Sequence, residues 1–297
     1  MSSHGRDRGT PTAAGSTGIA DDLDVDDYEL LDAGDGARLD RYGSRVVARP
    51  HPAAERGRRD PEAWSRASLA FQAGEGWTGL DAATAWEVTL AGLRLELRPT
   101  ATGQVGLFPE QAASWEWLRD LVASGATVLN LFAYTGAATL VAAAAGASVV
   151  HVDGSRPTVA WARRNAELSG LAERPIRWIV DDAAAFVARE LRRGRRYDGV
   201  VLDPPSYGHG AGGRSWRLED DLPRLLDQVA ELVGGPRGFV LLTAHTPGFW
   251  PDRLAEELAV SLGAPDAGIE RGPLTLTARS GATLHLGAFA RWPGKRS

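Results

Sequence analysis

An aspartate followed by two prolines ends a short apolar run and could hold an amine. In "YDGVVLDPPSYGHG" (residues 197–210), Asp203 precedes Pro204 and Pro205, and Tyr207 follows two positions later. The Asp203 carboxylate and the Pro204 carbonyl can both accept hydrogen bonds from one N–H group, while the prolines stiffen the backbone and bring no competing donor. Tyr207 can stack on a planar base. The alternative is a cis-proline turn with a structural role alone.

Two further carboxylates end apolar runs of the same kind. Asp153 closes "ASVVHVD", and Asp182 closes "IRWIVDD". An acid at the end of the second strand of such a fold can accept hydrogen bonds from ribose hydroxyls, and an acid at the end of the third can accept one from an adenine amino group. Each could instead cap the helix that follows, although Ser155 is better placed than Asp153 to do so.

The turn "AYTG" (residues 133–136) opens a helix after the first of these runs. Gly136 lets a ligand approach backbone amides at a helix N-terminus, where an anionic group is favoured. A dinucleotide site needs three glycines in G-x-G-x-x-G spacing, and this turn has one. With Asp153 and Asp182, the turn favours a nucleoside ligand without a pyrophosphate, namely S-adenosylmethionine, whose carboxylate would face the first helix.

Composition excludes several other classes of site. The 297 residues include no cysteine, so disulfides, thiolate metal sites and cysteine nucleophiles are excluded. The six histidines show no metal-ligand spacing, and we expect no metal. A net charge of −5 means that nucleic acid would have to bind a local patch. Without a membrane-length apolar run or a signal peptide core, we expect a cytoplasmic protein without membrane contact.

The pattern changes along the chain and predicts three parts. Residues 1–24 lack periodicity and are expected to be disordered. Residues 25–107 read as a small β-rich subdomain, with one hairpin around Gly34-Asp35-Gly36, a second turning at Ala91-Gly92, and a loop over 49–64 between them. Residues 108–297 carry the acids described above.

Strands and helices alternate from residue 127 onward. The expected strands span 127–133, 147–153, 176–182, 197–203, 238–244, 274–278 and 282–290, and the expected helices span 137–146, 155–170, 183–194, 218–235 and 251–263. This alternation predicts a doubly wound, mostly parallel sheet with helices on both faces. Ligands then bind at the carboxyl ends of the strands, where the loops containing Asp153, Asp182 and Asp203 meet.

Two arginine clusters occupy different places in this scheme. The run Arg192–Arg196 precedes the strand that ends in Asp203, so we expect it at the opposite edge, as a solvated turn. Arg214, Trp216 and Arg217 follow the Asp-Pro-Pro motif in a glycine-rich segment. They could form a lid that contacts the phosphate and base of a nucleic acid.

The motifs form an ordered set with a known counterpart. Asp203-Pro204-Pro205 resembles motif IV of class I methyltransferases that act on nitrogen. Together with "GLFPEQ", "VLNLFAYTGAATL", "VVHVDGSRPTVAWARRNAELSGL" and "WIVDDAAAFV", it resembles the family of S-adenosylmethionine-dependent methyltransferases that includes the bacterial 23S ribosomal RNA large-subunit enzymes. The resemblance implies a Rossmann-like class I fold with seven strands and the small β-rich subdomain ahead of it.

The resemblance also implies roles for individual residues. The cofactor-binding set is Phe108, Gln111, Asn130, Phe132, Tyr134, Thr135, Gly136, Asp153, Ser155 and Asp182. The catalytic set is Asp203, Pro204, Pro205 and Tyr207. Members that methylate cytosine C5 use a cysteine that adds to C6 of the base, and this chain has none.

We therefore expect N-methylation of a base in RNA, with ribosomal RNA the foremost substrate and the base flipped out of any duplex. Two alternatives remain open at this point. One is a methyltransferase of a protein or a small molecule, and the other is a cofactor-binding scaffold without activity. The sequence does not indicate an oligomeric state.

Overall fold

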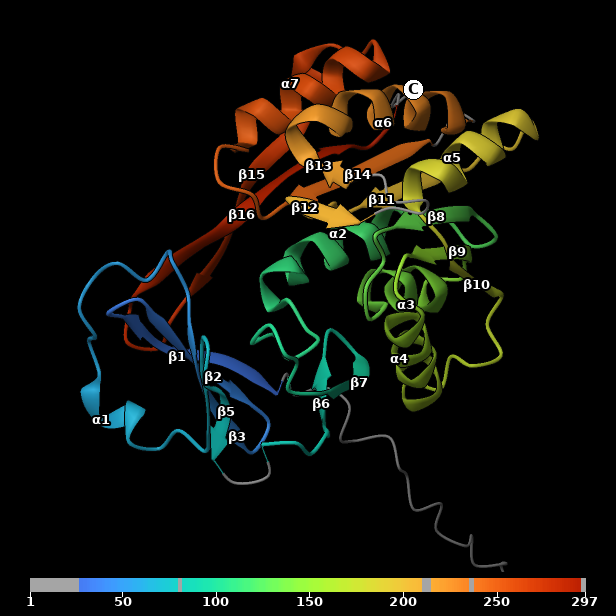
Figure 1. Ribbon diagram of the computed structural model, residues 1–297. Helices are drawn as coiled ribbons and strands as arrows, with labels where there is room; N and C mark the ends of the chain where they lie inside the picture. Colours follow the sequence, from blue (N-terminus) through green and yellow to red (C-terminus); the bar gives the residue numbers. More distant parts are fainter. Residues whose placement is uncertain (1–26, 80–81, 210–214, 235–237, 295–297) are drawn as a thin grey trace, which may run out of the picture.

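The computed structural model describes residues 27–79, 82–209, 215–234 and 238–294 (Figure 1). The predicted tail at 1–24 lies outside these residues. A smaller β structure formed by strands β1 to β7 lies beside a larger α/β structure, and two long C-terminal strands, β15 and β16, reach from the larger to the smaller (Figure 1).

The N-terminal part contains the following elements: β1 Tyr28–Gly34, β2 Ala37–Tyr42, β3 Arg45–Pro50, α1 Pro61–Trp64, β4 Leu69–Gln72, β5 Gly76–Gly79, β6 Trp86–Leu90 and β7 Leu93–Leu97. Strands β1 to β5 form one sheet in sequence order, and β6 and β7 form a separate hairpin. The turn between β1 and β2 has positive φ at Asp35 (52°) and Gly36 (74°), and the β6–β7 turn has positive φ at Ala91 (53°) and Gly92 (74°). Positive φ at both central residues occurs in tight two-residue turns whose backbone twist matches that of the flanking strands. Both predicted hairpins are confirmed.

The predicted loop over 49–64 is partly wrong, because β3 includes Arg49 and Pro50, and α1 follows at Pro61. Asp60 caps α1 by accepting a hydrogen bond from the Ala63 amide. Strands β4 and β5 have four residues each, and β4 pairs with β3 at only two positions. Such short strands carry almost no periodic signal, so pairing across the sheet decides their conformation.

The C-terminal part contains the remaining elements: the 3₁₀ turn η1 Pro109–Gln111, α2 Ala112–Leu121, β8 Thr127–Leu131, α3 Ala137–Ala144, β9 Ser148–Asp153, α4 Arg156–Leu168, β10 Ile176–Val180, α5 Ala183–Arg192, β11 Gly199–Leu202, β12 Tyr207–His209, β13 Ser215–Arg217, α6 Leu218–Leu232, β14 Phe239–Ala244, α7 Pro251–Leu262, the 3₁₀ turn η3 Asp266–Gly268, β15 Glu270–Thr277 and β16 Thr283–Trp292. The short β12–β13 pair and α2 have no counterpart among the expected elements.

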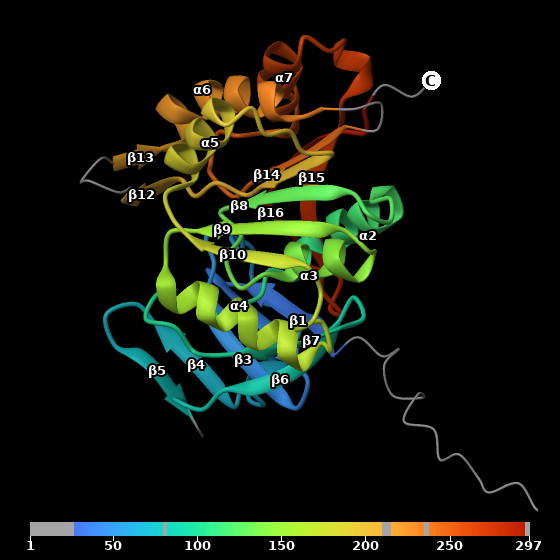
Figure 2. The same ribbon diagram turned by 90° about the vertical axis from the view of Figure 1, so that its right-hand side faces the viewer.

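The central sheet has the strand order β10-β9-β8-β11-β14-β16-β15. The first five strands are parallel, and β16 runs antiparallel to both of its neighbours. Helices α5, α6 and α7 lie over one face, and α2, α3 and α4 lie over the other (Figure 2). The predicted doubly wound, mostly parallel seven-stranded fold is confirmed.

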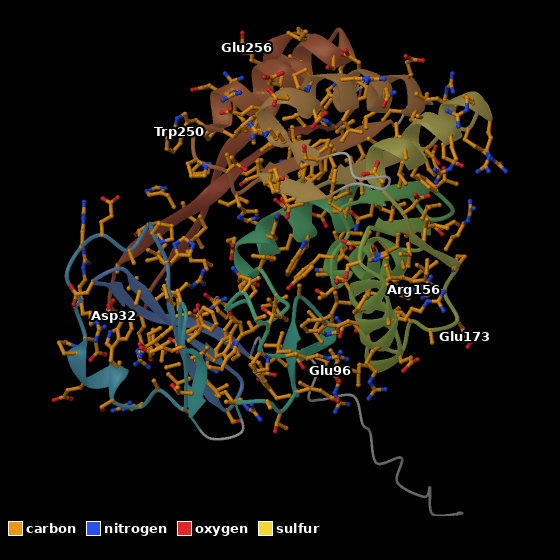
Figure 3. All side chains as sticks on the ribbon, in the orientation of Figure 1. Asp32, Glu96, Arg156, Glu173, Trp250 and Glu256 are labelled. Atoms are coloured by element: carbon orange, nitrogen blue, oxygen red, sulfur yellow. The ribbon has the colours of Figure 1, made fainter. Side chains whose placement is uncertain are left out.

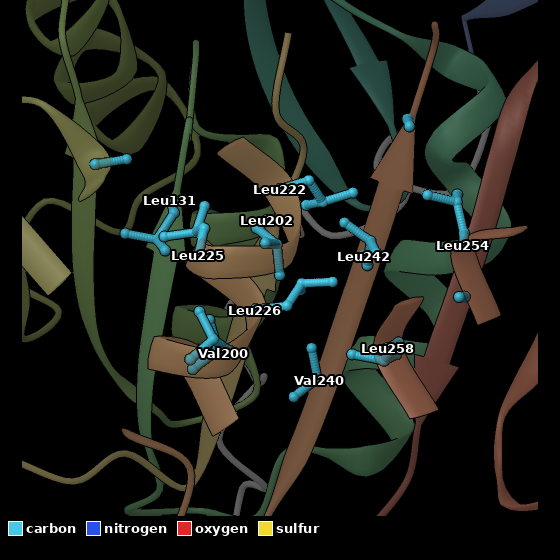
Figure 4. Packing of buried hydrophobic residues seen from close by; sticks show 14 of the residues in the cluster. Leu131, Val200, Leu202, Leu222, Leu225, Leu226, Val240, Leu242, Leu254 and Leu258 are labelled. Atoms are coloured by element: carbon cyan, nitrogen blue, oxygen red, sulfur yellow. The ribbon is translucent and has the colours of Figure 1, made fainter. Parts of the chain in front are cut away.

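Alternating residues of the central strands fill the two cores. On β11, Val200 and Leu202 pack beneath α6 and α7, whereas Val201 between them belongs to the core beneath α2 and α3. Figure 4 shows Val200 and Leu202 with Val240 and Leu242 of β14, facing leucines of α6 and α7. A strand buried on both faces needs continuous apolar residues, which is why an acid can follow only at its end.

Hydrogen bonds join the N-terminal and C-terminal parts at several places, including the following two. The Trp161 indole of α4 donates to the Glu96 carbonyl of β7 at 2.9 Å. The Ser280 hydroxyl, at the turn between β15 and β16, donates at 2.6 Å to Asp32 of β1. Figure 3 labels Asp32 and Glu96 in the smaller part. A boundary at residues 107 and 108 remains our proposal, and these contacts show that both parts contribute to one packed molecule.

Candidate active site

The loops after β8, β9, β10, β11 and β14 enclose a cavity of about 980 Å³ at the carboxyl edge of the sheet. Of the predicted site residues, this cavity is lined by Phe108, Phe132, Tyr134, Asp153, Ser155, Asp182, Asp203, Pro204, Pro205 and Trp216. Residues separated by more than a hundred positions therefore meet at one place. A cavity of this size can accept a ligand as large as a nucleoside that carries a further substituent.

The loop after β8 is held in an uncommon conformation. Phe132 and Tyr134 have positive φ angles of 53° and 49°, in the left-handed region that residues other than glycine rarely occupy. Such a residue costs about 1–3 kcal/mol, so neighbouring groups must hold it there. The Asp153 carboxylate does so in part, because its Oδ2 accepts from the Tyr134 amide and its Oδ1 from the Ser155 amide, each at 2.9 Å.

Asp153 is the last residue of β9, as predicted. Burial raises the pKa of its carboxyl, and the hydrogen bonds from the Ser155 and Tyr134 amides oppose that rise only in part. A ligand whose hydroxyl groups donate hydrogen bonds to this carboxylate would also oppose the rise in pKa and so favour the charged form.

Three predicted residues anchor this loop from beneath and line a narrower cavity of about 60 Å³. The Thr135 hydroxyl donates to the Gly106 carbonyl at 2.7 Å, and the Asn130 amide donates to the Thr139 hydroxyl at 2.9 Å. Gly136, with φ of 91°, is the N-cap residue of α3, and a Cβ there would lie 3.0 Å from the Cβ of Ala162. The glycine is thus required both by its conformation and by the close approach of α4.

The sequence left open whether Asp153 and Asp182 cap the helices that follow them. In the structure, Ser155 and not Asp153 caps α4, and Asp182 caps α5. Ser155 caps α4, with its hydroxyl accepting from the Thr158 amide at 3.4 Å. Asp182 caps α5, with its Oδ1 accepting from the Ala185 amide at 2.8 Å. The cap uses one of the two carboxylate oxygens, and Asp182 still lines the large cavity. Its predicted contact with an adenine amino group stays a prediction.

Asp203 directly follows β11, and its carboxylate is only partly hydrogen-bonded by the protein. Its Oδ2 accepts from the Gln111 amide at 3.1 Å and lies 3.5 Å from Nε2 of His245. Its Oδ1 is buried and has no hydrogen-bond partner among the described residues. Burial alone would raise the pKa of this carboxyl, but the charge of His245 and the hydrogen bonds from His245, Thr243 and Gln111 hold it below its usual range. No peptide bond in the described residues is cis, so the alternative of a cis-proline turn is wrong.

The predicted site residues did not include His245 and Glu110. His245 lies against Asp203, and Glu110 lies on the other side of its ring. Burial would lower the pKa of His245, but Asp203 and Glu110 raise it to about 9, so the imidazole is charged at neutral pH. Its ring also lies 5.3 Å from that of Phe108. One signal was available, because His245 belongs to "AHTPG", the loop after the fifth predicted strand.

The predicted lid residues are placed differently from one another. Trp216 is buried in the wall of the cavity, where its indole donates to the Pro205 carbonyl at 2.8 Å and its ring lies 5.2 Å from that of Phe132. It therefore supports the Asp-Pro-Pro segment from behind. Tyr207 has 53% of its surface exposed. Arg217 ends β13, and Arg214 lies outside the described residues.

The run Arg192–Arg196 lies between the end of α5 and the start of β11, at the edge opposite the cavity, as predicted. No cluster of histidine, aspartate and glutamate in the described ranges is suited to a metal ion. Within the same ranges, no helix is both long enough and apolar enough to cross a membrane.

Comparison with known proteins identifies the family. Residues 38–269 match the S-adenosylmethionine-dependent methyltransferase family. A solved S-adenosylmethionine-dependent methyltransferase of Agrobacterium tumefaciens is 37% identical, with a TM-score of 0.85 and 91% of each chain covered. A methyltransferase of Streptococcus mutans shares the fold, with a TM-score of 0.72 at 19% identity over 92% of this chain and 76% of that one.

Curated relatives match over a shorter stretch. The ribosomal RNA large subunit methyltransferase K/L of Methylococcus capsulatus is 36% identical over 43% of this chain and 17% of its own length. The ribosomal RNA large subunit methyltransferase K of Neisseria meningitidis is 32% identical over 46% of this chain and 38% of its own length. The chain thus spans well under half of either protein. The family match covers most of the chain and confirms the predicted cofactor: this chain belongs to the family of S-adenosylmethionine-dependent methyltransferases.

Proposed function

We propose that the protein transfers a methyl group from S-adenosylmethionine to a nitrogen atom of a base in RNA, with ribosomal RNA the foremost substrate, in the cytoplasm. The observation that carries this proposal is the Asp203 carboxylate, which is charged, lines the large cavity and has an oxygen without a hydrogen-bond partner among the described residues. Oδ1 itself is buried, but 29% of the Asp203 side chain is exposed, and this surface lines the cavity, where a target amine could contact it.

The residues around the cavity suit the cofactor. Asp153 would accept hydrogen bonds from ribose hydroxyls, and Asp182 would accept one from the adenine amino group. The amino end of α3, with Tyr134, Thr135 and Gly136, would face the carboxylate. Tyr134 and Phe108, whose rings lie 5.5 Å apart, provide apolar walls between these groups.

The chemistry demanded of the protein is mainly orientation. The cofactor supplies an electrophilic methyl group on a sulfonium. A bond forms between the target nitrogen and the methyl carbon as the carbon–sulfur bond breaks, and the nitrogen then loses a proton to solvent. Asp203 and the Pro204 carbonyl would accept hydrogen bonds from the target amine and aim its lone pair. Holding reactants in this way is worth about 10⁵–10⁸ M in effective concentration.

Two observations support RNA as the substrate class. The curated relatives are ribosomal RNA methyltransferases by name. Tyr207, exposed and four positions after Asp203, could stack on a base, as aromatic side chains do in proteins that bind single strands. The absence of cysteine from the sequence argues against attack at pyrimidine C5, which needs a thiolate to add at C6.

The test is product analysis with the purified chain. Ribosomal RNA transcribed without modifications is incubated with the cofactor, digested to nucleosides and examined by mass spectrometry, with Asp203→Ala as the control. An N-methylated nucleoside made by the wild type alone supports the proposal. A 5-methylpyrimidine would refute the mechanism, and methylation of added protein but not of RNA would refute the substrate class.

A further inference from the structure

Three ionisable side chains form a row from the interior to the cavity, and the family match says nothing of the middle one. Glu110 is buried, with a side chain 4% exposed, and its Oε1 lies 3.8 Å from Nδ1 of His245. On the other side of the ring, Nε2 of His245 lies 3.5 Å from Oδ2 of Asp203. The imidazole therefore stands between two carboxylates.

The hydrogen bonds around this ring fix its orientation. Nδ1 donates to the Leu286 carbonyl of β16 at 2.9 Å, so Nε2 is the nitrogen that faces Asp203. The Gln111 amide has two protons, which it gives to Asp203 at 3.1 Å and to the Thr243 hydroxyl at 3.0 Å. The Gln111 side-chain nitrogen also lies 3.3 Å from Nε2 but has no proton left for that contact, so the anion that faces a protonated Nε2 is Asp203, with its Oδ2 at 3.5 Å.

We propose that His245 is a positioning residue of the methyl transfer: as an imidazolium held by Glu110 and the Leu286 carbonyl, it keeps Asp203 ionised and fixed in orientation toward the target amine. This inference rests on the proposed function.

The physical need for a cation at this place follows from burial. A carboxyl group in a poorly solvated site tends to hold its proton, and a protonated Asp203 would present a donor where the target N–H needs an acceptor. An adjacent imidazolium reverses that tendency. The Glu110 carboxylate in turn stabilises the charged form of His245, which is largely buried and would otherwise lose its proton.

Charges from the N-terminal sheet stand behind this row. The buried Arg38 interacts electrostatically with Glu110, and so does the buried Tyr42. His51 also faces His245, and burial together with Arg38 and Arg49 lowers its pKa to about 4, so it is neutral at pH 7. The groups that raise the pKa of His245 are thus Asp203, Glu110 and the Leu286 carbonyl, whereas Arg38, Arg49 and Asp40 act on the neighbouring His51.

The test compares His245→Gln and Glu110→Gln with His285→Gln, a matched change at an exposed position of β16. The first readout is the NMR titration of the imidazoles in the chain without substrate. We expect His245 to titrate at about 9 in the wild type. It should titrate lower in Glu110→Gln and lower still in Asp203→Asn, while His285→Gln leaves it unchanged.

The second readout is the pH dependence of kcat. At pH 6, the kcat of His245→Gln should be about 10–100-fold below that of the wild type, by analogy with the range seen when a partner that orients a metal ligand is removed. Most of that loss should disappear by pH 9, where Asp203 ionises unaided. Cofactor affinity should change little, and His285→Gln should match the wild type throughout.

Either of two results would overturn the inference: a His245 midpoint near 6.5 that is insensitive to Asp203→Asn, or a kcat loss in His245→Gln that is equal at all pH values, which marks a merely structural role. The titration needs no substrate. A chain that methylates no RNA but retains the high midpoint would therefore refute the proposed substrate while supporting the ionised pair.

Discussion

Two aspartates that face cations, the buried Asp40 and the partly exposed Asp203, show how differently one side chain can be used. Asp40 lies in β2 and both of its oxygens are occupied: Oδ1 accepts from Tyr28 at 2.8 Å and Arg38 at 2.7 Å, and Oδ2 accepts from Arg38 at 2.9 Å and Arg49 at 3.3 Å. Asp203 has one oxygen with protein partners and one with none among the described residues.

The difference separates a structural acid from a functional one. Every acceptor site that Asp40 offers is filled by the fold itself, so a ligand has nothing to add. Asp203 keeps one oxygen without a partner among the described residues, and 29% of its side chain is exposed where it lines the cavity, so a ligand can still contact it. Ion pairing alone does not distinguish the two, since both carboxylates face cations and both have a lowered pKa.

The largest effect should come from removing the Asp40 carboxylate, whose two oxygens are both hydrogen-bonded within the fold. Asp40→Ala leaves Arg38 and Arg49 buried without an anion between them, and breaking such a pair costs about 3–5 kcal/mol in the free energy of unfolding. Urea denaturation would measure it. Asp120→Ala, at an exposed position of α2, is the control and should stay within about 0.5 kcal/mol. An equal small loss in both variants would contradict the structural role of Asp40.

Asp203→Ala should act on catalysis in place of folding. We expect kcat to fall by about 10²-fold or more with cofactor affinity almost unchanged, the pattern of an interaction used mainly in the transition state. Single-turnover kinetics and calorimetry measure the two quantities. Full activity in this variant would end the comparison with Asp40.

Asp153 should fall between the two, because it serves both the loop and the cofactor. Asp153→Ala should weaken S-adenosylmethionine binding by about 1–3 kcal/mol, the cost of leaving hydroxyl donors without a partner. Burial raises the pKa of this carboxyl, so wild-type affinity should fall as the pH is lowered through that raised value, and the variant should lack this dependence. Calorimetry over a pH series checks both, and NAD binding without S-adenosylmethionine binding would refute the site.

The smallest effect belongs to the arginines at the far edge. Replacing Arg192, Arg193, Arg195 and Arg196 by glutamine should leave turnover nearly unchanged, because they lie away from the cavity. Replacing Arg214 and Arg217 should raise the KM for RNA and reduce its dependence on salt, since each lost phosphate contact removes released counterions. If the replacements in the run Arg192–Arg196 raised the KM for RNA and those of Arg214 and Arg217 did not, the RNA would bind at the edge of the sheet opposite the cavity.

Periodicity was enough to predict the central sheet. Buried parallel strands read as continuous apolar runs, so the ends of β9 and β11 at Asp153 and Asp203 were visible. The row of Glu110, His245 and Asp203 was not visible, because it depends on β14 lying beside β11 and on η1 folding back over both. No local pattern encodes such convergence. The packing of Trp216 on Phe132 was not visible for the same reason, since the two residues are distant in sequence.

The turn between β15 and β16 has a consequence for synthesis of the protein. The Arg279 amide donates to the Leu30 carbonyl at 2.8 Å, and the Ser280 hydroxyl reaches Asp32 across 248 positions of sequence. Leu284 and Leu286 of β16 share an apolar cluster with Leu30 of β1. Strand β1 leaves the ribosome early but cannot bury this face until nearly the whole chain has emerged. We expect nascent chains to keep it uncovered and to depend on chaperones during that interval, as chains with distant pairings do.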